Sequence, residues 1–80
     1  METIEVKERN EVKVSSLGRN ERFKRGSKIA IVYAHYVGRK LKFHVYYYDE
    51  SKSIEVAIQY ASICGTTEGA ERKIRQFLFN

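Results

Sequence analysis

Cysteine, proline and tryptophan are almost missing from this chain of 80 residues, which has one cysteine and neither of the other two. The single Cys64 excludes an intramolecular disulfide framework and a zinc site built from several cysteines. No apolar run approaches the about 18 residues of a membrane-spanning helix, so we expect no membrane association. The first ten residues are charged where a signal peptide would be apolar. We therefore expect an intracellular protein, cytoplasmic or, in a eukaryote, nuclear.

Motifs of established chemistry are also lacking. Gly26-Ser27-Lys28 resembles the end of a phosphate-binding loop, but Glu21 stands where the loop requires glycine. Cys64 lies beside Gly65 in a connecting segment and has no expected histidine neighbour, so we interpret it as a buried or inert thiol. The sequence has no RNP-type motif, zinc-finger spacing or helix-turn-helix pattern. It therefore predicts a protein that is not an enzyme and uses no cofactor or metal.

Acidic side chains are scarce in the middle of the chain. Residues 19–48 hold eight lysines and arginines against one glutamate, a net charge of +7. The segments before and after them each sum to −1, so the whole excess of +5 comes from this middle third. A basic stretch of this kind attracts polyanions and speeds encounter with them.

Apolar residues make up 42% of the chain, enough for a small core in one domain over residues 1–80. Alternating apolar residues predict strands over residues 28–37, 41–48 and 53–60, joined by turns at 38–40 and 49–52. A helix over about 50–64 is the alternative for the third segment. Residues 3–16 predict one long strand or a hairpin, with a short helix over 2–9 as the alternative. Residues 18–27, bracketed by Gly18 and Gly26, predict a basic loop.

The C-terminal segment predicts a helix with Thr67 as its N-cap and acidic residues in its first turn. Ala70, Ile74, Phe77 and Leu78 fall on one face of this helix. The expected fold class is α+β: a small antiparallel β-meander of three to five strands, with one C-terminal helix packed on one face.

Strand register decides which side chains share a face. The larger apolar residues of segments 28–37 and 41–48 have odd numbers, which predicts a three-residue turn with Val37 opposite Leu41. Between segments 41–48 and 53–60, a four-residue turn at 49–52 would place Tyr48 opposite Ser53. The helix would then cover the odd-numbered residues of segments 28–37 and 41–48 and the even-numbered residues of segment 53–60. His35 and His44 would lie on opposite faces. The face left uncovered would carry Val32, Ala34, Tyr36, Lys42, His44, Tyr46, Tyr48, Glu55, Ala57 and Gln59.

Such a face suits nucleic acid, because bases stack on aromatic rings and cations bind phosphates. The predicted binding residues are Arg19, Arg22, Phe23, Lys24, Arg25, Lys28, Tyr36, Arg39, Lys40, Lys42, His44, Tyr46 and Tyr48. The expected partner is DNA or RNA, with single strands slightly favoured over a duplex whose groove the sheet would enter. The alternative is a small protein-interaction or inhibitory module, a homodimer or the partner of a larger protein, acting through the same tyrosines.

Overall fold

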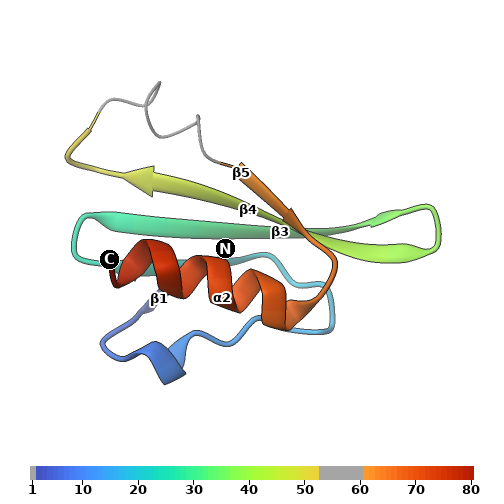
Figure 1. Ribbon diagram of the computed structural model, residues 1–80, viewed down its shortest axis with the longest axis horizontal. Helices are drawn as coiled ribbons and strands as arrows, with labels where there is room; N and C mark the ends of the chain where they lie inside the picture. The colour runs from blue at the N-terminus through green and yellow to red at the C-terminus, as the bar shows by residue number, and fades with distance from the viewer. Residues whose placement is uncertain (1, 53–60) are drawn as a thin grey trace.

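The computed structural model describes residues 2–52 and 61–80 of the chain. Their elements, shown in Figure 1, are β1 (Thr3–Glu5), the 3₁₀ helix η1 (Arg9–Glu11), β2 (Glu21–Arg25), β3 (Lys28–Val37), β4 (Lys40–Asp49), β5 (Ala61–Cys64) and α2 (Thr67–Leu78). The strand predicted over residues 53–60 and the pairing of Tyr48 with Ser53 lie outside the described residues.

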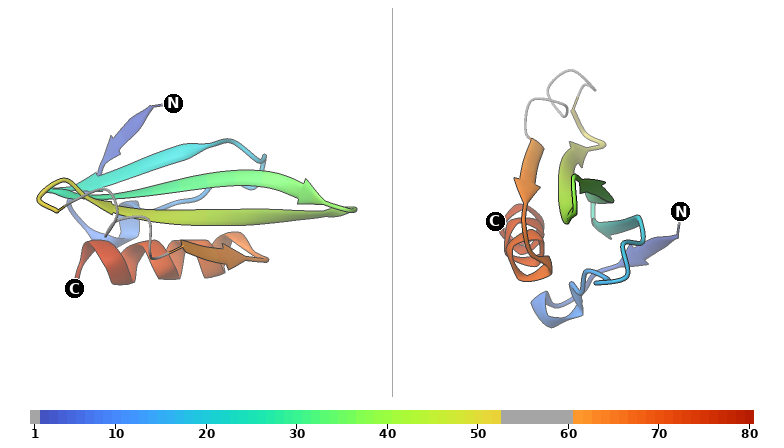
Figure 2. Two further views of the ribbon diagram at one scale, coloured as in Figure 1. Left: turned by 90° about the horizontal axis from the view of Figure 1, so that it is seen from above. Right: turned by 90° about the vertical axis from the view of Figure 1, so that its right-hand side faces the viewer.

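The described strands form one sheet in the order β1-β2-β3-β4-β5. β1 runs parallel to β2, and all other neighbours are antiparallel. Figure 2 shows α2 on a single side of this sheet. The prediction of an α+β fold with one C-terminal helix on one face is therefore confirmed.

Two tight hairpins build the centre of the sheet. Gly26 and Ser27 join β2 to β3, and Gly38 and Arg39 join β3 to β4. Each glycine takes the first position of its turn with a positive φ, +62° and +65° respectively. A two-residue turn of this kind matches the right-handed twist of its strands, and glycine adopts it without steric cost.

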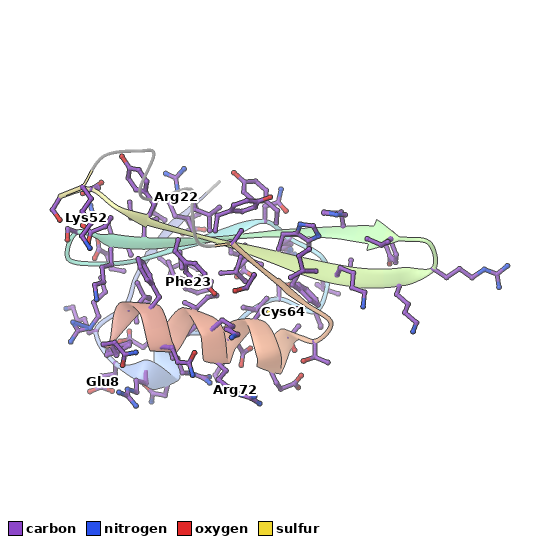
Figure 3. The ribbon with its side chains drawn as sticks, turned by 45° about the horizontal axis from the view of Figure 1, so that its top comes forward. Glu8, Arg22, Phe23, Lys52, Cys64 and Arg72 are labelled. Atoms are coloured by element: carbon purple, nitrogen blue, oxygen red, sulfur yellow. The ribbon has the colours of Figure 1, made fainter. Side chains whose placement is uncertain are left out.

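The basic loop predicted over residues 18–27 is wrong for half of its length, because Glu21–Arg25 is strand β2. Phe23 lies opposite Ala30 and is fully buried, whereas Arg22 and Lys24 point to the other side of the sheet. Figure 3 shows Phe23 between the sheet and α2, and Arg22 beyond the sheet. Burial of the Phe23 ring and a complete antiparallel ladder with β3 are sufficient for this segment to form a strand, although its other four residues are charged.

The predicted register between β3 and β4 is also wrong. Val37 lies opposite Lys40, not Leu41, because the turn has two residues and not three. This one-residue change moves every side chain of β3 to the other face relative to β4. The even-numbered residues Ala30, Val32 and Ala34 of β3 therefore share the α2 side with Phe43 and Val45.

The observed register has a packing reason. β3 is apolar on both faces, so alternation alone does not say which face is covered. The covered face has the smaller side chains, and Ala30 and Val32 are fully buried in the cluster that contains Ala70 and Ile74 of α2. Small residues let a helix approach a sheet closely, so the core reaches high density with them.

The N-terminal segment completes the core on the α2 side. It was expected to be a strand or hairpin, or else a helix over 2–9, but apart from the short β1 and η1 it is irregular. Val6, Val12 and Val14 are buried in the core. Helix side chains hold its backbone: the Val14 N–H donates to Glu71 (2.9 Å), and Arg75 donates to the carbonyls of Arg9 (3.1 Å) and Val12 (3.2 Å). The tertiary partner α2, and not local periodicity, determines this conformation.

Helix α2 begins one residue earlier than predicted. Its N-cap is Thr66, whose hydroxyl accepts the Gly69 N–H at 3.0 Å, while Thr67 is the first helical residue. The predicted apolar face is confirmed: Ala70, Ile74 and Leu78 are buried, and Phe77 packs against them. Residues 62–66 were expected to connect to this helix, but strand β5 (Ala61–Cys64) occupies the first three of them.

Replacing Thr66 by alanine is expected to lower the free energy of unfolding by about 1 kcal/mol, because the Gly69 N–H loses its acceptor. Urea titration followed by circular dichroism measures the change. The matched control is Thr67→Ala, which leaves that hydrogen bond intact and should cost clearly less. Equal losses in the two variants would contradict the assignment of Thr66 as the cap.

Candidate functional site

The sheet side opposite α2 forms a surface that no described element covers, which we call the open face (Figure 2). The register places alternate residues of each strand on it. From β2, β3, β4 and β5 these are Arg22, Lys24, Ile29, Ile31, Tyr33, His35, Val37, Lys40, Lys42, His44, Tyr46, Tyr48, Ala61 and Ile63. On these four strands the face is therefore a mixture of cations, aromatic rings and aliphatic side chains, and the edge strand β1 adds Thr3 and one carboxylate, Glu5.

An aromatic row, made of Tyr33, His35, His44 and Tyr46, crosses the middle of the open face. Tyr33 lies directly opposite His44. The rings of Tyr33 and Tyr46 meet edge to face, with centroids 5.5 Å apart, and those of His35 and His44 are 4.1 Å apart. The prediction that the two histidines lie on opposite faces is wrong, and the corrected register is the reason. The same correction adds Tyr33 and His35 to the site, which the sequence had not singled out.

The tyrosines of the row are only partly accessible. Tyr33 is 38% exposed and Tyr46 is 40% exposed, whereas Ile63 beside the row is 70% exposed. Rings packed against each other present edges and parts of their faces to solvent. The row is therefore a largely pre-formed apolar surface with limited room for flat rings to stack on it.

Cations flank the aromatic row. Arg22 lies opposite Ile31, Lys42 opposite His35, and Lys40 opposite Val37. The ion pairs found among the described residues, Lys24–Glu50 and Arg75–Glu71, leave these three cations without an acidic partner there. The open face thus has a positive charge that the described part of the chain does not neutralise.

Two buried polar atoms on the open face have no hydrogen-bond partner within the described residues, Arg22 Nε and His44 Nε2. An unpartnered buried polar group costs about 1–3 kcal/mol. Native proteins have few of them, and each requires an explanation, such as a functional site or an ordered water molecule. Both atoms lie on the open face, because Arg22 is one of the flanking cations and His44 belongs to the aromatic row.

The far end of the β3–β4 hairpin projects beyond the rest of the molecule, as Figure 1 shows. β2 pairs with β3 only as far as Val32, and β5 pairs with β4 only as far as Phe43. Residues 35–42, which we call the arm, therefore lie outside both neighbouring ladders. Tyr36 is 70% exposed and Val37 is 56% exposed, and Arg39 and Lys40 at the turn are exposed as well.

Several predicted binding residues lie elsewhere. Phe23 is in the core, and the Lys28 ammonium donates to the carbonyls of Phe77 and Asn80 at the end of α2. The Arg25 guanidinium lies 4.4 Å from the Phe79 ring centroid, and Arg19 is exposed before β2. The structure thus brings together Arg22, Lys42, His44, Tyr46 and Tyr48 on the open face, with Tyr36, Arg39 and Lys40 on the arm.

Tyr36 belongs to the α2 side of the sheet by register, because it lies opposite Leu41, but it extends past the core and stays exposed. The expected position of Val32 and Ala34 on the open face is wrong, since both face α2. The expected positions of Lys42, His44, Tyr46 and Tyr48 agree with the structure. The length of the β3–β4 turn changes the face of β3 residues only, and it does not change which residues of β4 lie under α2.

A groove of about 490 Å³ lies on the other side of the sheet. It lies between α2 and the strands β4 and β5, and Lys28, Lys73, Tyr47 and Phe77 are among its lining residues. It has the same positive sign as the open face but faces away from it. One nucleic-acid segment lying along the open face would not reach this groove.

In the described part of the chain, no three or more histidine, cysteine or acidic side chains lie close enough to hold a metal ion. Cys64 is buried, as expected, and burial raises the pKa of its thiol, although Lys73 opposes the shift. The described residues include no helix long and apolar enough to span a membrane.

No protein-family model, curated protein or solved structure matches the chain.

Proposed function

We propose that this protein binds nucleic acid without catalysing a reaction, through the open face and the arm. The observation that supports the proposal best is the placement of Arg22, Lys40 and Lys42 on one surface beside the aromatic row. Cations with no acidic partner attract phosphates, and the tyrosine and histidine rings can contact bases or sugars.

The charge distribution supports a polyanion over a neutral partner. No acidic residue occurs in the sequence between Glu21 and Asp49, the stretch that forms β3 and most of β2 and β4. The exposed Ile63 and Val37 favour a second candidate, a protein partner held by apolar contacts. The two functions differ in salt dependence, because apolar contacts release no counterions from the ligand.

Fluorescence anisotropy with single- and double-stranded oligonucleotides at two salt concentrations tests the proposal. We expect the logarithm of the association constant to fall with the logarithm of salt by about 0.7–0.9 for each phosphate contacted. Lys42→Glu, on the open face, should weaken binding about tenfold at 0.1 M salt by removing one such contact. Lys73→Glu, an equal change of charge on α2, is the matched control and should change binding little.

Absence of binding to any oligonucleotide at low salt would overturn the proposal. Equal losses in Lys42→Glu and Lys73→Glu would show that net charge alone matters, and that the open face is not the contact surface. Either result would turn attention to a protein partner at Ile63 and the tyrosines.

A further inference from the structure

We infer that the arm enters the major groove of double-stranded DNA, which makes a B-form duplex the preferred partner of this protein. The inference rests on the proposed function and adds the form of nucleic acid and the element that recognises it. It starts from the shape of the arm, a two-stranded ribbon that no third strand of the described residues flanks (Figure 1).

The dimensions of the arm fit this groove. Two paired strands lie about 4.8 Å apart, and their side chains extend the ribbon on both faces. The major groove of B-form DNA is about 12 Å wide and admits a two-stranded ribbon. Outside both ladders the arm has three residues on each strand, 35–37 and 40–42, or about 10 Å at 3.3 Å per residue, which slightly exceeds the groove depth of about 8.5 Å.

The side chains of the arm suit base edges and phosphates. Arg39 and Lys40 at the turn are the exposed cations that reach farthest along the hairpin, and Lys42 follows on the open face. Arginine and lysine donate to guanine in the major groove, and apolar groups contact the thymine methyl. Tyr36 and Val37 provide exposed apolar surface at the same end. No acidic side chain in the arm would repel the phosphates on the two sides of the groove.

Single strands and RNA duplexes fit the structure less well. A single strand held by stacking needs free ring faces, but the rings of the aromatic row pack on one another. An RNA duplex has a deep and narrow major groove that side chains cannot read. The slight preference for single strands that the sequence suggested is therefore replaced by a preference for duplex DNA.

The test compares the full-length protein with Arg39→Gln/Lys40→Gln and with Arg72→Gln/Lys73→Gln. Both variants replace one adjacent, exposed arginine–lysine pair and remove the same charge, the first from the arm and the second from α2. Each protein is titrated into a DNA duplex, the corresponding single strand and an RNA duplex of equal length. We expect the wild type to bind the DNA duplex at least about tenfold more tightly than the other two ligands.

The arm variant should lose about tenfold or more in affinity for the DNA duplex, and its salt slope should fall by about 2, one unit for each phosphate that its side chains no longer bind. The α2 variant should lose less than about threefold. Equal binding of DNA and RNA duplexes, tighter binding of the single strand, or equal losses in the two variants would overturn the inference and leave the proposed function standing. Binding to none of the three ligands would overturn both.

Discussion

Replacing Phe23 by alanine is expected to lower the free energy of unfolding by about 3–5 kcal/mol. Phe23 is fully buried and has the largest volume among the completely buried side chains, so its removal leaves a cavity between the sheet and α2. A domain of 80 residues has a total stability of about 4–12 kcal/mol. The substitution therefore removes a large part of this stability, and urea unfolding followed by circular dichroism measures the loss.

Two further variants make the Phe23 result interpretable. Phe23→Leu keeps most of the apolar volume and should lose less than the alanine variant. Tyr36→Ala removes an aromatic ring of similar size from the arm, where Tyr36 is 70% exposed, and should change stability by less than about 0.5 kcal/mol. If Phe23→Ala were as stable as Tyr36→Ala, the Phe23 ring would not lie in the core and β2 would not have the register found for it.

Replacing Ala30 by lysine should destabilise the protein by several kcal/mol or prevent folding. Ala30 has no exposed surface and lies opposite Phe23 and Tyr47 on the sheet surface that faces α2. A long side chain there overpacks the core, and its charge would be buried without a partner. Thermal unfolding and the yield of soluble protein both report this effect.

Tyr33→Lys is the matched variant on the same strand and tests the register directly. Tyr33 is on the open face, so the lysine can reach solvent, and only the edge-to-face packing of the ring on Tyr46 is removed, at a cost of about 1 kcal/mol. A three-residue turn at 38–40 would reverse the order, with Tyr33→Lys the damaging change and Ala30→Lys tolerated. The relative stability of the two variants therefore distinguishes the two registers.

Strands β3 and β4 were predictable within one residue, because β3 is rich in β-branched and aromatic residues and β4 has a regular alternation. Helix α2 was predictable for a similar reason, since its apolar residues recur every three to four positions. Strand β2 was not, because Glu21–Arg25 contains one apolar residue among four charged ones. Its conformation depends on a ladder to β3 and on the burial of Phe23, and neither is visible in so short a segment.

The candidate site was predictable in part. Lys42, His44, Tyr46 and Tyr48 were placed correctly, because the large apolar residues of β4 all have odd numbers and leave its even-numbered residues uncovered. The sequence did not place Tyr33 and His35 on the open face, and it did not show that Phe23 and Lys28 lie away from this face, because both points require the register of β3 and the strand nature of β2. Gly38 is the one local signal of the observed register, because glycine favours the positive φ that the first residue of a two-residue turn requires.

The sequence by itself determined the concentration of positive charge in residues 19–48, the long β3–β4 hairpin and the amphipathic C-terminal helix. These are local properties, set by composition and by the periods of strand and helix. Only the tertiary structure decided which face of β3 lies under α2, and with it which rings and cations share the open face. A period of two says that alternate residues share a side, but which side is buried depends on how closely α2 can pack against Ala30 and Val32.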